Sequence, residues 1–548
     1  MAATLLEFAE VCEKVKATSS KKQKISIVAN YLRGLSREDL PLACRLLTSR
    51  VFPPWDARAV NISYSTILDA LREITGVDEK RLKATYLKYG DLGSAAEELM
   101  QDKKVTTLMQ TPLTLQNVYS ALDSAASKKG EGAAEHRERV LKGLLALCSP
   151  LEAKYLVKVL CGEMRIGLDE GLLEEALAVA YGRSLKKVRE ASLVVADIGE
   201  TSLIALDGSF DSLKLKLFHP TNFMLAEEMS SPQEVADYFR CELYAEYKYD
   251  GVRAQIHSND KEVRIFSRRL EDITHSFPEL HTPVGIEVIL DGEIVPYKDG
   301  LLPFQKLQQR LHRKTITREV LEETPVIYFA FDILYYNGET YINKPLKERR
   351  AILESLDLKP PLYYANQTKV RSEDEIKEAF ESSLKLGYEG LMIKRPDSEY
   401  TPGKRGKKWI KLKKELATLD VVIVAAEYGH GKRAGLLSDY TFAVKSRDGL
   451  RVIGKAYSGL TDKEILDMTE ILNRLTIKDL GHKKIVEPKI VLEVAFNNIQ
   501  RSSRHNSGYA LRFPRIKRIR WDKSVDEIDT LDRVKEIYEQ QTRKVIVQ

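Results

Sequence analysis

The stretch "EYKYDGVRAQIH", residues 246–257, places a lysine, an Asp-Gly step and an arginine close together. Alternation of side-chain types on both sides of the Asp-Gly step predicts two strands joined by a turn. Glu246, Lys248 and Asp250 fall on one face of the first strand, because side chains alternate with a period of two. Lys248 is therefore expected at a strand end beside a turn, with Arg253 just past that turn.

The pattern of apolar residues in the 548-residue chain differs on the two sides of this stretch. Upstream, apolar residues repeat at helix spacing, as in "LDEGLLEEALAVAYG" (168–182). After "WIKLKK" (409–414), short strands with few long helices indicate a small barrel. We therefore predict a multidomain chain with a helical domain over 1–215, an α+β domain over 216–415 and a β-barrel over 416–548.

The net charge of +6 hides two basic runs. Residues 403–414 carry seven bases and no acid, and residues 501–523 carry eight bases and one acid. Charge concentrated in this way attracts the phosphates of a nucleotide or of a nucleic-acid backbone. Both runs are interleaved with aromatic and aliphatic residues, so we expect them in folded strands and not in tails.

Several compositional features bound the kind of protein. None of the five cysteines forms a C-x-x-C pair, so we predict reduced core thiols in an intracellular protein, with neither a zinc site nor a disulfide framework. The N-terminus lacks the pattern of a signal peptide. The longest apolar runs, such as "VVIVAA" (421–426), are too short to span a membrane. The charged fraction of 30%, rich in Lys, Arg and Glu, predicts a heat-adapted source.

A lone K-x-D-G is most simply a surface lysine beside a hairpin turn, but five further segments accompany it. They are "FSRRLEDIT" (266–274), "LDGEIV" (290–295), "FAFDILYYNG" (329–338), "EGLMIKRP" (389–396) and "KKWIKLK" (407–413). Each alone is ordinary strand sequence. In this order and with this spacing they resemble the motifs of the covalent nucleotidyltransferases, which comprise DNA ligases, RNA ligases and capping enzymes.

The chemistry of such an enzyme explains the residue types. A free lysine titrates near pKa 10.4, so roughly one in 2,500 is uncharged at pH 7, and neighbouring cations or a metal ion raise that share. The amine attacks the α-phosphorus of a nucleoside triphosphate, and charge gathers in the transition state. Arg253, Lys411, Lys413 and a divalent cation are suited to stabilise that charge. Glu389 suits magnesium, and Phe331 suits base stacking.

The C-terminal run narrows the resemblance. "SGYALRFPRIKRIRWDK" (507–523) resembles the last motif of ATP-dependent DNA ligases, and residues 428–444 resemble the opening of their oligonucleotide-binding barrel. Residues 90–99 and 162–178 resemble their helical domain. The resemblance covers essentially the whole chain and is closest to the replicative type of archaea and eukaryotes. It implies an all-α DNA-binding domain, an α+β adenylation (nucleotidyltransferase) domain and an OB-fold β-barrel.

By that resemblance, Lys248 is the adenylated nucleophile. The residues expected to bind the nucleotide are Glu246, Arg253, Arg268, Glu293, Phe331, Arg405, Lys411, Lys413 and Arg512. Phe331 would stack on adenine, Glu293 would hold the ribose, and Glu389 with Glu293 would bind metal. Which of Arg512, Lys517 and Arg518 contacts pyrophosphate stays open. The family often has Asn at the position of Arg269 and an acid at that of Trp521.

The implied reaction adenylates the lysine with ATP, transfers AMP to the 5′-phosphate of a nick in duplex DNA, and lets the 3′-hydroxyl displace AMP. Such an enzyme serves replication, repair and recombination. We expect Mg²⁺, with Mn²⁺ open, a monomer, and a place in the cytoplasm or nucleoid of an archaeon. A sliding clamp is a candidate partner, although "QTPLTLQNVYSAL" (110–122) is too weak a match to identify a clamp-binding peptide.

Three alternatives remain beside this interpretation. An RNA-capping guanylyltransferase shares K-x-D-G, but the helical domain and the "RFPRIKRIR" ending argue against it. NAD-dependent ligases carry a cysteine zinc site. No C-x-x-C occurs here, which argues against that class. A DNA-clamping scaffold with an inactive nucleotide pocket would have little reason to keep this set of lysines and carboxylates. A P-loop is not indicated, because "GHGKRAG" (429–435) lacks G-x-x-x-x-G-K-[ST].

Overall fold

The computed structural model describes residues 2–56, 58, 60–104, 112–311, 313, 316–413, 417–429, 433 and 435–546. The chain divides into two compact units. The first comprises Met1–Glu227, Cys241–Arg371 and Met392–Lys411, and the second comprises Glu228–Arg240, Ser372–Leu391 and Leu412–Gln548. The predicted domain limits concern a different division of the chain and stay predictions.

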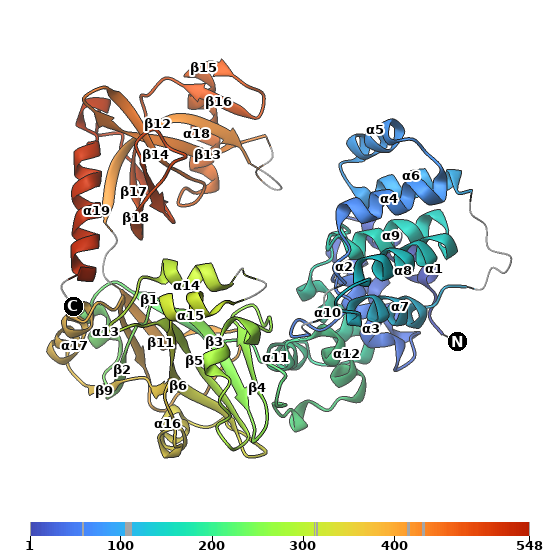
Figure 1. Cartoon of the computed structure of the whole chain (residues 1–548), viewed down its shortest axis with the longest axis horizontal. Helices are drawn as coiled ribbons and strands as arrows, with labels where there is room; N and C mark the ends of the chain where they lie inside the picture. Colours follow the sequence, from blue (N-terminus) through green and yellow to red (C-terminus); the bar gives the residue numbers. More distant parts are fainter. Residues whose placement is uncertain are drawn as a thin grey trace. The chain divides into compact units, whose positions relative to one another are not determined.

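The N-terminal part of the first unit is built from helices (Figure 1). They are α1 (Leu5–Lys16), α2 (Lys21–Arg33), α3 (Asp39–Leu47), α4 (Tyr64–Thr75), α5 (Glu79–Tyr89), α6 (Leu92–Leu99), η1 (Met100–Asp102), α7 (Leu115–Ser127), α8 (Ala133–Leu147), α9 (Pro150–Leu160), α10 (Glu170–Tyr181), α11 (Leu185–Val195), α12 (Ile198–Asp207) and η2 (Phe210–Ser212). Their apolar faces share one buried core.

Local sequence explains where these helices begin and end. The Asp169 side chain accepts a hydrogen bond from the Leu172 N–H and so caps the start of α10. Gly182 adopts a φ of 62° at the end of α10, a conformation that favours glycine. The helix predicted from the apolar repeat is thereby confirmed. Lys158 on α9 is almost fully buried and forms an ion pair with Asp91, the N-cap of α6.

The central part of the chain forms two sheets. Their strands are β1 (Leu225–Met229), β2 (Leu243–Tyr247), β3 (Val252–Ser258), β4 (Val263–Ser267), β5 (Val288–Pro296), β6 (Val326–Tyr336), β7 (Glu339–Thr340), β8 (Leu362–Tyr364), β9 (Gln367–Val370), β10 (Gly390–Lys394) and β11 (Arg405–Lys413). One sheet has the order β4-β3-β5-β6-β7, with β8 parallel to β6. The other has the order β1-β11-β10-β2-β9.

Helices accompany these sheets. They are α13 (Pro232–Tyr238), η3 (Thr274–Ser276), η4 (Pro278–Leu280), α14 (Phe304–Leu311), α15 (Arg318–Glu323), α16 (Leu346–Ser355) and α17 (Glu373–Lys385). Helix α16 packs on β6 and brings Arg349 to Asp332 at 2.7 Å. Both side chains are fully buried, and Arg349 also donates to the Ser398 carbonyl. Pairing and hydrogen bonds make burial of these two charges tolerable.

Buried polar side chains of β3 hold the segment that leads from the helices to β1. The Phe218 N–H donates to His257 Nδ1 at 3.0 Å. The Gln255 amide bonds the backbone of Thr221 twice, at 3.1 and 2.8 Å. Gln255 and His257 are fully buried. The backbone of this segment therefore supplies the partners that these side chains need inside the protein.

The buried imidazole of His257 makes the stability of the fold depend on pH. Burial, with smaller effects from His219 and Arg264, lowers the pKa of His257 well below 6.5. In the unfolded chain the imidazole binds a proton near pH 6.5, whereas in the folded chain it stays neutral. The contribution of His257 to the free energy of unfolding is therefore complete above about pH 6.5 and is lost as pH falls below that value.

We therefore expect His257→Asn to flatten the decline of the thermal midpoint between about pH 7 and pH 5. The asparagine oxygen can still accept the Phe218 N–H. His281→Asn, at an exposed position, controls for the loss of a histidine. An equally steep decline in His257→Asn and in the unchanged protein would contradict this origin of the pH dependence.

The C-terminal part of the second unit is rich in strands. It contains β12 (Thr418–Tyr428), β13 (Leu437–Ser446), β14 (Gly449–Ala456), α18 (Asp462–Arg474), β15 (Thr476–Asp479), β16 (Lys483–Val486), β17 (Val491–Ala495), β18 (Asn498–Arg501), β19 (Tyr509–Arg512), β20 (Arg515–Ile519), η6 (Val525–Glu527) and α19 (Leu531–Ile546). Strand β12 pairs antiparallel with β13, β16 and β17 around an apolar core.

The predicted fold class is confirmed: a helical N-terminal region, a central α+β region and a strand-rich C-terminal region. The first basic run lies largely in strand β11, as predicted, whereas only part of the second lies in β18, β19 and β20, and Arg504, Arg520 and Lys523 fall outside strands. Lys414, which ends the first run, lies outside the described residues.

The cysteines confirm the prediction only in part. Cys12, Cys44 and Cys148 are buried, but Cys161 is partly exposed and Cys241 is exposed, so the expectation of five core thiols is wrong for these two. Sequence alone did not show that Cys241 falls between α13 and β2. Among the helices that the structure describes, none has the length and apolar character needed to cross a membrane.

Candidate active site

Lys248 lies half-buried one residue beyond β2, in the turn that leads to β3. Gly251 closes this turn against β5. A Cβ atom at Gly251 would lie 2.2 Å from the Ile294 carbonyl oxygen and 2.9 Å from Glu293 Cγ. Glycine is therefore required here by close approach of two backbones, and that approach sets Glu293 next to the turn that carries Lys248.

A second glycine shapes the strand that carries Glu293. A Cβ atom at Gly292 would lie 2.4 Å from the ring of Tyr328, whose hydroxyl donates to main-chain oxygens of the neighbouring strands. The pairing of β5 with β6 shifts register at this point. Beyond the shift, Glu293 lies opposite Arg253 on β3 and Phe329 on β6. The irregularity thus fixes where Glu293 projects.

Arg253 is held in a fixed orientation. Its guanidinium donates to both oxygens of Asp291, at 3.1 and 2.7 Å, and to the Met224 carbonyl at 2.7 Å. The Tyr400 hydroxyl donates to Asp291 as well, at 2.8 Å. Burial opposes the charged form of Arg253, but the Asp291 carboxylate outweighs burial and raises the pKa of Arg253. The guanidinium carbon lies 5.3 Å from the centre of the Phe331 ring.

Lys394 on β10 joins two residues predicted to bind the nucleotide. Its Nζ lies 2.6 Å from Glu246 Oε2, and the two side chains are 1% and 2% exposed. The same Nζ lies 4.3 Å from the centre of the Phe331 ring and 4.2 Å from that of Trp409. Burial lowers the pKa of Lys394, while Glu246 opposes that effect. Gln367 Nε2 donates to the other oxygen of Glu246 at 2.8 Å.

Comparison with known proteins decides the family. Residues 223–413 match the model of the ATP dependent DNA ligase domain, residues 4–178 that of the DNA ligase N terminus, and residues 433–523 that of the ATP dependent DNA ligase C terminal region. A probable DNA ligase of Koribacter versatilis is 44% identical over 569 residues, with 98% of each chain covered. The chain belongs to the ATP-dependent DNA ligases.

Other relatives of this ligase agree with that assignment. A DNA ligase of Archaeoglobus fulgidus is 37% identical, with 98% of each chain covered. DNA ligase 1 of Korarchaeum cryptofilum is 39% identical, with 98% of this chain and 99% of that one covered. A solved chain titled Pmar-Lig_PreS3 matches with a TM-score of 0.56 and 16% identity, covering 94% of the ligase and 99% of that chain. This last likeness shows the fold alone.

Three more predicted nucleotide-binding residues belong to the first unit of the ligase. Arg268 is exposed just after β4, one residue beyond Ser267, which pairs with Ala254 of β3. Arg405 is exposed at the start of β11, and Lys411 is half-buried near the end of that strand. Arg268 thus lies in the turn that follows the β3–β4 ladder.

The remaining predicted residues belong to the second unit. Lys413 Nζ lies 3.4 Å from Glu389 Oε2. A Cβ atom at Gly390 would lie 2.1 Å from the Leu412 carbonyl oxygen, so close approach requires glycine next to Glu389 as well. Arg512 lies at the end of β19, with its guanidinium carbon 5.0 Å from the centre of the Phe513 ring.

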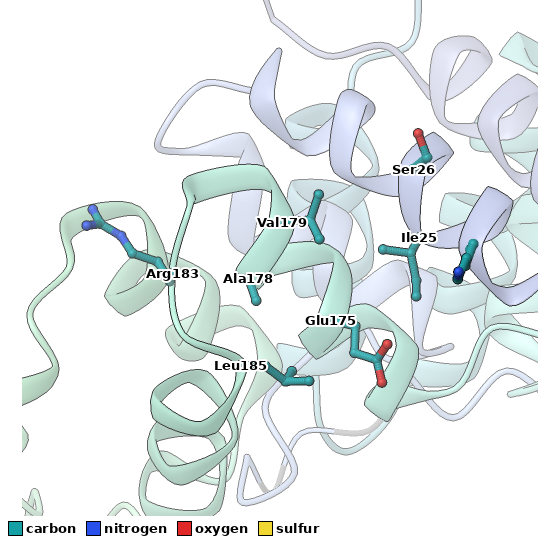
Figure 2. A pocket seen from close by; sticks show the side chains of 8 residues that line it. Ile25, Ser26, Glu175, Ala178, Val179, Arg183 and Leu185 are labelled. Carbon is teal, nitrogen blue, oxygen red and sulfur yellow. The ribbon is translucent and has the colours of Figure 1, made fainter.

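A pocket in the helical region lies apart from the candidate site. Figure 2 shows side chains that line it, and they come mainly from α2 and α10. The lining residues are Lys22, Ile25, Ser26, Glu175, Ala178, Val179, Arg183 and Leu185. Arg183 is already engaged, because it donates to the carbonyls of Ala205 and Leu206. None of the predicted nucleotide-binding residues lines this pocket, so we assign it no part in the chemistry.

Sequence reasoning gave no role to three residues that the structure brings to the site. Tyr400 and Gln367 carry no distinctive signal in the sequence, because a tyrosine and a glutamine are common in loops and edge strands. Lys394 had one: it ends the apolar strand "GLMIK", where a charge needs a partner if it is buried. Only the paired strands show that the partner is Glu246.

Proposed function

We propose that the ligase seals nicks in duplex DNA through an AMP adduct on Lys248. Membership of the ATP-dependent DNA ligases supplies the reaction. The observation that supports the choice of nucleophile is the close approach of Gly251, in the turn that carries Lys248, to Glu293 and the Ile294 carbonyl. Glu246 and Arg253 flank the turn on β2 and β3. No other reacting group is needed from the protein, because each step transfers phosphorus between nucleophiles.

In the proposed first step the Lys248 amine, without its proton, attacks the α-phosphorus of ATP. A P–N bond forms, the α–β bridging P–O bond breaks, and pyrophosphate leaves. In the second step an oxygen of the 5′-phosphate at the nick attacks the same phosphorus and releases the lysine. In the third step the 3′-hydroxyl attacks the 5′-phosphorus, AMP leaves, and the phosphodiester forms. Positioning and charge neutralisation account for most of the catalysis.

The proposed roles follow the chemistry of each side chain. Phe331 stacks on the adenine, and Glu293 accepts hydrogen bonds from the ribose. Arg253 uses three of its five N–H groups on Asp291 and Met224, which leaves donors for the nucleotide. Cationic partners of the phosphates are Arg268, Arg405, Lys411, Lys413 and Arg512. One of the last-motif bases Arg512, Lys517 and Arg518 makes the proposed contact with pyrophosphate.

We propose Mg²⁺, with Mn²⁺ as the alternative, as the metal for which Glu389 and Glu293 are the candidate ligands. Both side chains are half-buried oxygen donors. Among the described residues no cluster of three or more His, Cys, Asp or Glu could hold a metal. Magnesium commonly takes one or two carboxylates and completes its shell with water and substrate phosphates. When bound, such an ion supplies positive charge against the phosphates.

We further propose that strands β11 and β20 contact the phosphates of nicked DNA, so that binding is largely independent of sequence and weakens with salt. We also propose that the ligase is a monomer and that a sliding clamp is its partner. Its proposed role is in replication, repair and recombination, inside the cell of a heat-adapted archaeon. Of the segment weighed as a clamp peptide, Gln110 and Thr111 lie outside the described residues, and Tyr119 packs on Phe52 in the helical region.

The proposal predicts that purified protein given ATP and metal acquires one AMP on Lys248 and seals a nicked duplex. Peptide mass spectrometry locates the adduct, and gel analysis of a labelled nick follows sealing with ATP, ADP, GTP and NAD supplied singly. An adduct formed with GTP alone would favour a guanylyltransferase. Sealing with ATP while Lys248 stays unmodified would overturn the proposed nucleophile.

A further inference from the structure

Three side chains form a buried chain of contacts beside the predicted base-binding ring. Lys394 Nζ lies 2.6 Å from one oxygen of Glu246, and Gln367 Nε2 donates to the other at 2.8 Å. The amide of Gln367 is oriented by this bond, because only its nitrogen can donate to a carboxylate. Its carbonyl oxygen is thereby directed away from Glu246.

The pair is costly as a purely structural element. Lys394 and Glu246 are 1% and 2% exposed, so both side chains have lost their hydration shells. Apolar residues of similar volume in their place would often give a protein of equal or greater stability. The charged groups around Lys394 are Asp332 and Asp291, which act on it through space, and Arg253, which shares the Phe331 and Trp409 rings with it. Lys248 lies two residues after Glu246, in the turn beyond β2. This buried Lys–Glu pair is thus found where a nucleotide is expected.

The geometry places this chain where a nucleobase would lie. Glu246 lies on β2 and Lys248 lies one residue beyond its end; two residues of extended backbone correspond to about 7 Å. Phe331 contacts the same ammonium as Glu246. A nucleotide whose α-phosphorus meets Lys248 and whose base stacks on Phe331 therefore brings the edge of that base toward Glu246 and Gln367.

We propose that Lys394 is a positioning residue that makes the ligase select a 6-aminopurine nucleotide over a 6-oxopurine nucleotide. An ionised carboxylate only accepts hydrogen bonds, and the oriented carbonyl of Gln367 also accepts. The 6-amino group of adenine donates to such an edge. The 6-oxo oxygen of hypoxanthine or guanine is itself an acceptor, so it would face the acceptor oxygens of Glu246 and Gln367 with no hydrogen to bond them. The inference rests on the proposed function, because it concerns the nucleotide that modifies Lys248.

Removing the ammonium changes the character of this edge. A buried carboxylate without a counter-charge neutralises by binding a proton or draws in water. A protonated carboxyl has an O–H donor, and Gln367 is then free to turn its amide. Either change supplies a donor for a 6-oxo group. The discrimination between the two purines should fall, while a loss of folded protein alone would lower both rates equally.

The test compares Lys394→Met with the unchanged enzyme in single-turnover formation of the lysine adduct from ATP and from ITP, quantified by intact-protein mass spectrometry. We expect the ratio of the ATP rate to the ITP rate to fall about tenfold or more, the range of a hydrogen bond to a charged group. Lys158→Met makes the same change at a buried, ion-paired lysine in the helical region. It should leave the ratio unchanged.

Glu246→Gln provides a second route to the same result, since its amide carries a donor in place of the acceptor. If Lys394→Met does not fold, Glu246→Gln tests the inference by itself. We expect its ratio of the ATP rate to the ITP rate to fall as well. Unchanged ratios in the variants that fold would overturn the inference while leaving the adduct chemistry intact. Absence of any adduct on Lys248 in the unchanged enzyme would instead overturn the proposed function, so the two failures are distinguishable.

Discussion

Lys248→Arg abolishes the covalent adduct and, with ATP as the only donor, nick sealing: we expect both rates to fall about a thousandfold or more. The substitution keeps the positive charge and most of the length of the side chain. It removes the nucleophile, because a guanidinium is not deprotonated at any working pH. The measurement is single-turnover labelling with ATP, followed by sealing of a nicked duplex.

The control for this prediction is a nick that already carries AMP on its 5′-phosphate. The third step needs no attack by lysine, so Lys248→Arg should seal this substrate far better than an unadenylated nick with ATP. Lys261→Arg makes the same change at an exposed lysine in the β3–β4 turn and should behave as the unchanged enzyme. Wild-type sealing by Lys248→Arg with ATP would show that another group takes the nucleotide.

Sequence predicts well what depends on local periodicity and on caps. The repeat over 168–182 predicts α10, and its two ends lie at Asp169 and Gly182 because a side-chain cap and a left-handed glycine are local signals. Alternation about the Asp-Gly step likewise predicts β2, the turn and β3. These features are encoded within a few residues, so a single chain without relatives is enough to find them.

Contacts between distant strands are where sequence falls short. Nothing near Gly251 tells that its neighbour is the Ile294 carbonyl, and nothing near His257 tells that it accepts the Phe218 N–H. The partner of Lys394 is likewise fixed by strand order, since β10 and β2 are neighbours in the sheet but lie far apart in the chain. Residue types at the candidate site were predictable from a motif, whereas the groups that orient them were not.

The largest effect expected from a change that removes no functional group is that of Gly251→Ala. The added Cβ would lie 2.2 Å from the Ile294 carbonyl oxygen, whereas ordinary contact begins at 3.4 Å. Ile294 is fully buried in the central strand β5, which pairs on both sides. Because β5 cannot yield, the turn that carries Lys248 must move by about 1 Å, and a misplacement of that size costs about a hundredfold in rate.

We therefore expect Gly251→Ala to form the lysine adduct at least about a hundredfold more slowly while its helical region stays folded. Single-turnover labelling with ATP gives the rate, and circular dichroism reports the helices. Gly143→Ala is the matched control, because nothing lies within 4 Å of a Cβ atom at that exposed position in α8. Alanine there should raise stability by up to about 1 kcal/mol and leave the rate unchanged. A Gly251→Ala enzyme that labels at the normal rate would mean that the turn tolerates displacement, and the approach of β5 to Lys248 would then not be what positions the nucleophile.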